Sequence, residues 1–136
     1  MIIGIDARSL EWQRGAVARF TFELLKRWNK KEDSSKYVLF FQNKIPEDLD
    51  FLGQNFEFHL LKGPQILKSR RILSEQFLLP QAIKKTKCEV FLATTYSAPI
   101  FTSCPIILCM WDITFTTYGN HYAFFQRLVL SVFARI

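Results

Sequence analysis

The stretch that decides the fold runs from Ile2-Ile3-Gly4-Ile5-Asp6 through an amphipathic segment at 15–28 to Tyr37-Val38-Leu39-Phe40-Phe41. Its first part is rich in β-branched residues and predicts a short buried strand, followed by a loop from Arg8 to about Gly15. The middle part predicts an amphipathic helix, because apolar residues recur there at helical spacing, at Val17, Phe20, Leu24 and Trp28. The last part predicts a second strand, so the chain opens with a strand–helix–strand unit.

The rest of the chain continues this alternation. Three further strands are predicted at 56–61, 90–93 and 106–111, and two further helices at 68–86 and 122–136. Pro80 either kinks the helix at 68–86 or occupies the first turn of a restarted segment. The segment 106–111 is apolar throughout, which is typical of a strand buried on both faces. Alternating strands and helices predict an α/β fold, a Rossmann-like three-layer sandwich with a mainly parallel sheet.

Composition limits the class of protein. A length of 136 residues suits a single domain, 1–136, and 49% hydrophobic residues exclude a disordered chain. No apolar run reaches the ~18 residues that a membrane span needs. The three cysteines are odd in number and lack a Cys-x-x-Cys pair, which argues against a disulfide framework or a zinc site. We therefore expect a cytoplasmic protein without a metal ion.

The positive charge is concentrated in one segment. Residues 62–87 account for the whole formal net charge of +6, with Glu75 as their one acidic residue. Because apolar residues accompany the cations, the segment suits an anionic membrane surface, and a basic helix face in solvent is an equally weighted alternative. Nucleic acid ranks lower, since Phe77 is the one aromatic residue there. The proposed surface residues are Lys68, Arg70, Arg71, Lys84, Lys85 and Lys87.

Candidate site residues follow from the carboxyl ends of the predicted strands, where open α/β sheets bind ligands. Three segments lie there, at 6–20, 94–99 and 111–112. Gly15-Ala16 opens the first helix, whose amides could hold a phosphate, although the standard glycine-rich phosphate patterns are absent. For each segment a plain turn or cap is the favoured simpler interpretation. His59 and His121 belong to no catalytic or metal-ligating pattern, and no cofactor is expected.

Several motifs in order resemble a known family. The chain carries Ile3-Gly4-Ile5-Asp6-Ala7-Arg8-Ser9-Leu10, Gly15-Ala16-Val17-Ala18-Arg19-Phe20, Leu79-Pro80, Val90-Phe91, Tyr96-Ser97-Ala98-Pro99 and Asp112-Ile113-Thr114-Phe115. Together these resemble the N-terminal domain of the group 1 glycosyltransferases (family 4, GT-B fold). The similarity extends from Ile2 to about Arg135.

The resemblance implies a retaining hexosyltransferase of cell-envelope polysaccharide synthesis. Such an enzyme moves a sugar from a nucleotide-sugar donor to a glycan or lipid-linked acceptor, in a cleft between two Rossmann-like domains. The N-terminal domain holds the acceptor, and the C-terminal one holds most of the donor. By this resemblance Gly15 and Ala16 form the donor-phosphate loop, and the acceptor cleft contains Asp6, Arg8, Arg19 and Tyr96.

The departures from the family concern the reacting centre. Trp111 stands where the family usually has a histidine before Asp112, Leu92 replaces a second histidine, and Glu89 replaces an aspartate. An indole donates a hydrogen bond but cannot accept one as an imidazole does.

The second departure from the family is that the chain matches its N-terminal domain alone. The chain stops inside the apolar segment 122–136, so we expect a partial protein that lacks the donor domain and transfers no sugar alone. Self-association through that segment and peripheral contact with the inner face of the membrane are further expectations. A non-catalytic binding module on the same fold is the alternative function, and a flavodoxin-like cofactor binder is a weaker one.

Overall fold

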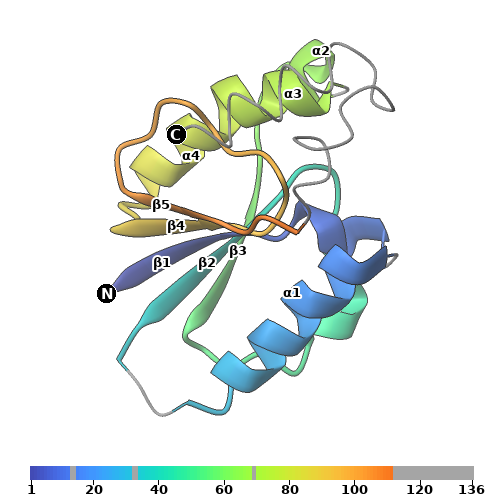
Figure 1. The fold of residues 1–136 in the computed structure, drawn as a ribbon, viewed down its shortest axis with the longest axis vertical. Helices are drawn as coiled ribbons and strands as arrows, with labels where there is room; N and C mark the ends of the chain where they lie inside the picture. Colours follow the sequence, from blue (N-terminus) through green and yellow to red (C-terminus); the bar gives the residue numbers. More distant parts are fainter. Residues whose placement is uncertain (13–14, 32–33, 69, 112–136) are drawn as a thin grey trace.

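The computed structural model describes residues 1–12, 15–31, 34–68 and 70–111. These residues form an α/β fold around a five-stranded, all-parallel sheet (Figure 1). The strand order is β3-β2-β1-β4-β5, which is consistent with a Rossmann-like sandwich. The strands are β1 (Ile2–Asp6), β2 (Lys36–Phe41), β3 (Phe56–Leu60), β4 (Val90–Ala93) and β5 (Ile106–Leu108). The α/β class and the parallel sheet are thus confirmed.

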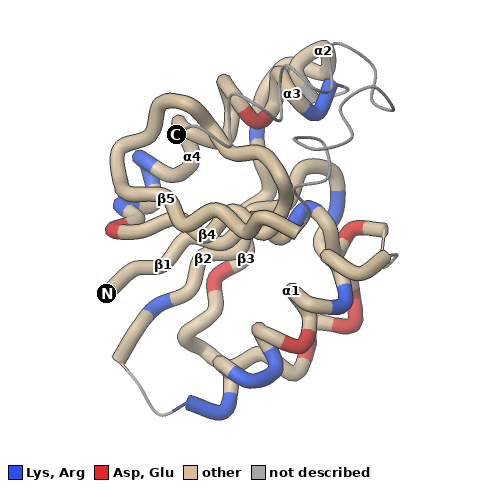
Figure 2. The backbone as a smooth tube through the Cα atoms, viewed as in Figure 1, with Lys and Arg blue, Asp and Glu red and all other residues tan. Residues whose placement is uncertain are grey.

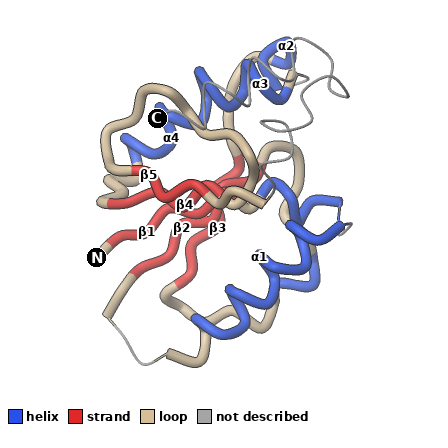
Figure 3. Tube along the Cα trace, viewed as in Figure 1, coloured by secondary structure: helices blue, strands red, loops and turns tan. Residues whose placement is uncertain are grey.

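Helices cover both faces of this sheet (Figure 3). On one face lies α1 (Gly15–Trp28), together with the short 3-10 helices η1 (Arg8–Trp12) and η2 (Glu47–Leu49). On the other face lie α2 (Gln65–Lys68), α3 (Arg71–Leu73), the π-helical turn η3 (Ser74–Leu78) and α4 (Leu79–Lys85). Each face buries its own apolar cluster, one beneath α1 and one beneath α4. The sheet therefore separates two hydrophobic cores.

Gly4 lets the core close tightly over the central strand. A Cβ at this position would lie 2.9 Å from the Cys88 Sγ and 3.0 Å from a ring carbon of Phe91. A ring carbon of Phe40 would be 3.1 Å away. The first contact is closer than real Cβ atoms come and the other two are tight, so a side chain on Gly4 would force Cys88, Phe91 or Phe40 to shift.

The first helix forms where it is predicted, but it is rotated. Its fully buried residues are Ala18, Thr21 and Leu25, whereas Phe20 is exposed. The prediction that Phe20 lies on the buried apolar face of this helix was therefore wrong. Hydropathy does not reveal the buried face, because Thr21 on that face is polar. The Thr21 hydroxyl donates to the Val17 carbonyl at 2.8 Å, so its hydrogen-bonding need is met within the helix.

Two predicted connections differ from the structure in detail. The segment after β1 was expected to be a loop, but residues 8–12 form η1. The helix expected at 68–86 is divided: α2 ends at Lys68, and a new run of helix continues from Arg71 through Lys85. Pro80 is the second residue of α4, as the interpretation of a restarted segment predicted, and it directly follows the π-helical turn η3, from which the helical run continues without a gap.

The predicted strand at 106–111 is shorter and less buried than expected. β5 ends at Leu108, and Ile107 is 57% exposed. The prediction of a strand buried on both faces was therefore wrong. Apolar composition alone cannot separate a central strand from one that pairs only with β4 among the described strands. Within the part of the chain that the structure describes, no helix has the length and apolar character to cross a membrane.

Candidate functional site

The carboxyl ends of β1 and β4 lie side by side, at the point where the strand order of the sheet reverses. β1 pairs with β2 on one side and with β4 on the other, and the connections after β1 and after β3 lie on opposite faces. Open α/β sheets leave a crevice for ligands at such a point. The polar residues that follow these strand ends therefore define the candidate site.

A buried cluster of charged side chains lies at the carboxyl ends of β1 and β4. The Arg8 guanidinium donates to both carboxylate oxygens of Asp6, from Nε at 2.8 Å and from Nη2 at 2.7 Å. The same Nη2 also donates to Glu75 Oε2 at 2.8 Å. All three side chains are almost completely buried. One cation from the β1–α1 connection thus joins the central strand to the π-helical turn on the opposite face.

Hydroxyl groups complete the shell around the cluster. Thr94 donates to the Asp6 backbone carbonyl at 2.7 Å, and Thr95 donates to Asp6 Oδ2 at 3.3 Å. Ser97 donates to Glu75 Oε2 at 2.9 Å. The cluster therefore ties the loop after β4 to β1 and to η3.

The cluster keeps Asp6 ionised. Burial by itself raises the pKa of Asp6, but the charge of Arg8, its hydrogen bonds and the charge of Arg71 together bring that pKa below the ordinary 3.8. The pKa of Arg8 is raised in return, against its own burial, chiefly by Asp6 and then by Glu75. Asp6 therefore anchors the arginine and is not a proton donor at neutral pH.

One donor of the cluster is left over. Arg8 Nη1 is buried and has no hydrogen-bond partner among the described residues. A buried donor without a partner costs about 1–3 kcal/mol, so such groups call for an explanation. Other atoms of Arg8 line a cavity of about 330 Å³, whereas Nη1 itself is closed off from solvent.

Gly15 and Ala16, which the resemblance assigns to a phosphate loop, are the first two residues of α1. Gly15 has a φ of 88°, which favours glycine, and among the described residues outside its chain neighbours none lies within 4 Å of where its Cβ would be. Gly15, Ala16 and Arg19 line a cavity of about 580 Å³, and Asp48 belongs to the same lining. The first turn of the fourteen-residue α1 therefore lines a cavity among the described residues.

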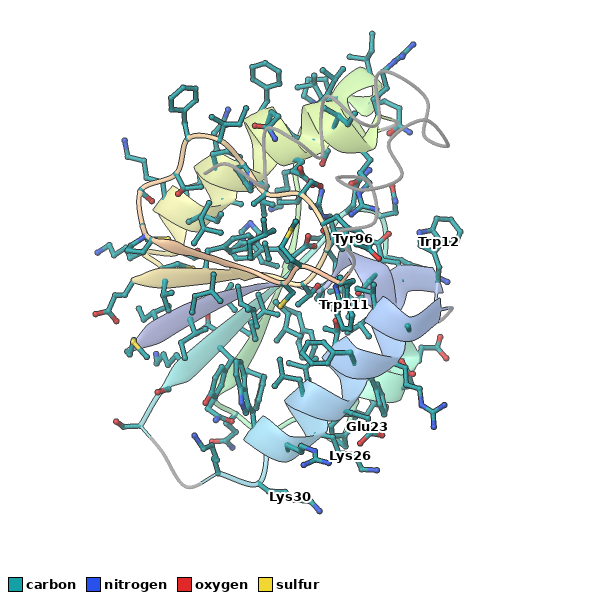
Figure 4. All side chains as sticks on the ribbon, in the orientation of Figure 1. Trp12, Glu23, Lys26, Lys30, Tyr96 and Trp111 are labelled. Atoms are coloured by element: carbon teal, nitrogen blue, oxygen red, sulfur yellow. The ribbon has the colours of Figure 1, made fainter. Side chains whose placement is uncertain are left out.

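Three cavities adjoin one another along this edge. The cavity at Gly15 shares Asp48 with a second cavity of about 710 Å³, which continues over Pro46 to Trp12. The second shares Glu11 and Trp12 with the 330 Å³ cavity at Arg8. Glu11 is buried, and its carboxylate accepts from the backbone amides of Gln42 and Asn43 and from the Asn43 side chain. Trp12 projects outward at the rim (Figure 4).

Trp111 makes structural contacts at the end of β5. Its indole Nε1 donates to the Thr94 carbonyl at 2.8 Å, and its ring meets Phe20 of α1 edge-on, with centroids 4.8 Å apart. The side chain closes the seam between α1 and the loop after β4. Tyr96 follows on that loop and is partly exposed. Asp112, the other residue of the predicted pair, lies outside the described residues.

The predicted basic surface is divided into two groups at opposite ends of one helical layer (Figure 2). Arg70 and Arg71 open α3, which follows the carboxyl end of β3, whereas Lys84, Lys85 and Lys87 close the connection to the start of β4. All five are exposed; the side chain of Lys68 lies outside the description. Ile72 and Phe77 are exposed between the two groups, whereas Leu79 and Ile83 face the core.

The chain matches no protein-family model. It has no significant similarity to a curated protein or to a solved structure. Its function therefore rests on the site itself.

Sequence reasoning overlooked three residues of this site. Glu75 could have been found, because a single carboxylate among seven cations is the expected partner of a buried arginine. Glu11 and Trp12 gave no signal, since they lie in a segment expected to be a loop. Among the residues that the structure places, no group of three or more side chains could hold a metal ion.

Proposed function

We propose that this chain is the acceptor-side domain of a retaining glycosyltransferase of the GT-B type. The enzyme would transfer a sugar from a nucleotide-sugar donor to a glycan or lipid-linked acceptor. The observation that carries this proposal is the first turn of α1, which follows the carboxyl end of β1 and lines a cavity that shares lining residues with a second, and the second with a third. Such an edge suits two substrates that must lie side by side.

The chemistry of the first cavity supports a role beside the donor phosphates. The amino end of a helix carries partial positive charge and free N–H groups, which stabilise a diphosphate leaving group. The positive φ of Gly15 and the empty space around it allow close approach of a phosphate to the backbone. Arg19 lines the same cavity and adds a full positive charge. A second domain would hold the nucleotide against this wall.

The test measures transfer by the natural gene product. Radiolabelled sugar from a panel of nucleotide sugars should reach a glycan or lipid-linked acceptor. Arg19→Glu should lower this transfer at least tenfold, because a negative charge would face the diphosphate. Arg27→Glu, on an exposed arginine in the last turn of α1, is the matched control and should leave it unchanged.

Residues 1–136 alone should transfer nothing, because orienting donor and acceptor needs both walls of a cleft. Transfer by residues 1–136 alone, or full activity in Arg19→Glu, would contradict the proposal.

A non-catalytic binding module is the second candidate function, and the contacts of Trp111 favour it. The indole is bound to the Thr94 carbonyl and packed on Phe20, at a position where the resemblance expects an imidazole near the sugar. Trp111→His in the natural gene product separates the two functions. A rise in transfer rate supports a weakened enzyme, whereas no transfer in either form, with acceptor still bound, supports the binding module.

We also propose that the protein works in the cytoplasm and touches the anionic inner face of the membrane. The exposed Ile72 and Phe77 between two basic groups support this orientation, since each cation near such a surface contributes about 1 kcal/mol. The segment 122–136, expected to mediate self-association, lies outside the described residues.

Liposome co-sedimentation tests the membrane contact. Lys84→Glu with Lys85→Glu should abolish binding to vesicles that contain phosphatidylserine, and added salt should weaken binding by the wild type. Lys26→Glu with Arg27→Glu is the matched control, because that pair also closes a helix but on the opposite face of the sheet. Equal binding to neutral vesicles, or equal loss in both variants, would exclude this surface.

A further inference from the structure

The loop between β4 and β5 carries two apolar side chains that lie largely in solvent. Phe101 is 84% exposed and Ile100 is 50% exposed, whereas the two residues before them, Ala98 and Pro99, are buried. Single exposed apolar residues are ordinary on a protein surface, but a contiguous exposed patch marks an interaction site. The surroundings of this loop are therefore the deciding observation.

The loop is fixed against η3 by one side chain. Gln76 Nε2 donates to the Ala98 carbonyl at 3.1 Å, and Gln76 Oε1 accepts from the Ile100 amide at 3.0 Å. Ala98 belongs to the apolar core beneath α4, so the loop runs along the face of the sheet that α4 covers (Figure 1). On the other side of the exposed tip, the Thr102 hydroxyl donates to the Cys104 carbonyl at 2.7 Å. The fold therefore holds the tip in place on both sides.

The turn that holds the loop adds apolar exposure of its own. Phe77 follows Gln76 in η3 and is 54% exposed, and Ile72 in α3 is 52% exposed. Because Gln76 bonds to the backbone of the loop, Phe77 and Ile100 belong to adjoining segments on the same face of the sheet. The loop tip therefore extends the apolar surface that lies between the two basic groups.

The charge around this surface indicates its partner. Glu75, the one acidic residue of the segment 62–87, is buried and bound to Arg8. Exposed cations lie at both ends of the helical layer, namely Arg70, Arg71, Lys84, Lys85 and Lys87. An apolar surface flanked by cations is complementary to an anionic bilayer, where the cations contact lipid headgroups and the apolar side chains enter the boundary with the acyl chains.

We propose that the loop between β4 and β5 inserts its tip, Ile100 and Phe101, into the boundary of an anionic bilayer beside Phe77. This inference rests on the membrane contact proposed above and names the segment that enters the lipid. Charge attraction brings the basic groups to the headgroups, and the inserted side chains add an apolar contribution that salt does not screen.

Vesicle binding by the natural gene product tests the role of the loop. Phe101→Ala should weaken binding to phosphatidylcholine vesicles that contain phosphatidylserine about tenfold, because the variant loses the largest inserted side chain. The fold should be unaffected, since this side chain is exposed. Trp12→Ala is the matched control and should bind as the wild type does, because Trp12 is a 69% exposed aromatic residue of η1, on the opposite face of the sheet.

Added salt distinguishes the loop from the basic groups. The difference in binding between wild type and Phe101→Ala should stay at about tenfold as salt rises, whereas the effect of Lys84→Glu with Lys85→Glu should shrink. A difference for Phe101→Ala that disappears at high salt would contradict insertion.

Insertion itself can be followed with Phe101→Trp. The fluorescence that the new indole adds to that of the wild type should be quenched by phosphatidylcholine brominated on its acyl chains. Ile45→Trp, at an exposed position between β2 and η2, is the control and should not be quenched. Equal quenching of both, or of neither, would count against the loop as the inserted segment.

The outcomes also separate the loop from the other proposals, because no arm measures sugar transfer. If the wild type binds no anionic vesicle, both the membrane contact and the insertion are overturned. If Phe101→Ala binds as the wild type does, the insertion alone is overturned and the basic contact stands. If Phe101→Ala abolishes self-association in light scattering and leaves vesicle binding unchanged, the loop is instead an interface between copies of this chain.

Discussion

Replacing Arg8 with alanine should lower the free energy of unfolding by about 3–5 kcal/mol, because it leaves two buried carboxylates without their cation. Asp6 and Glu75 both bind this one guanidinium, and both lie out of reach of solvent. Domains of this size have about 5–15 kcal/mol of stability in total. The variant should therefore be partly unfolded at 37 °C, which urea unfolding followed by circular dichroism would measure.

Arg19→Ala is the control for this experiment, since Arg19 is exposed on α1 and forms no buried ion pair among the described residues. It should change stability by less than about 0.5 kcal/mol. The free energy of unfolding of Arg8→Lys should lie between those of Arg8→Ala and Arg19→Ala, because an ammonium group cannot contact both carboxylates in the geometry of a guanidinium. If Arg8→Ala lowers the free energy of unfolding by less than about 1 kcal/mol, the buried cluster does not stabilise the carboxyl ends of β1 and β4.

Acid should destabilise the protein through the same cluster. The pKa of Asp6 in the folded protein lies below its ordinary value of 3.8, because Arg8 and Arg71 outweigh the effect of burial. Asp6 therefore contributes stability that is fully present above pH 3.8 and is lost as the pH falls through the lower folded pKa. Thermal unfolding between pH 7 and pH 2 should show a falling melting temperature across this window.

Asp6→Asn tests whether Asp6 causes that loss. The amide keeps the shape of the side chain but not its charge, so the variant should lose about 3–5 kcal/mol at pH 7. Once the pH has fallen below the folded pKa of Asp6, which lies under 3.8, the stability of the variant should approach that of the wild type, because protonated Asp6 is also neutral. Asp50→Asn, on an exposed aspartate, is the matched control and should keep the wild-type profile. Identical pH dependence in wild type and Asp6→Asn would contradict the role given to Asp6.

The sheet was predictable because its strands carry local signals. β1, β2 and β4 are short runs of β-branched and aromatic residues, and each is buried in the structure. Their alternation with α1 and the 71–85 layer requires crossover connections, and crossovers produce parallel strands. The rotation of α1 was not predictable, because Thr21 is polar by hydropathy and becomes apolar in effect only when its hydroxyl is bound within the helix.

By itself the sequence determined the α/β class, the positions of the strands and the segments that lie at the carboxyl edge, because periodicity and strand ends are local properties. The tertiary structure alone decided which of those residues act together. Glu75 meets Arg8 across 67 positions, and Trp111 reaches Thr94 across 17. Charge and burial depend on such distant partners, so only the folded chain shows that Asp6 is closed off from solvent and that Arg8 and Trp12 line one cavity.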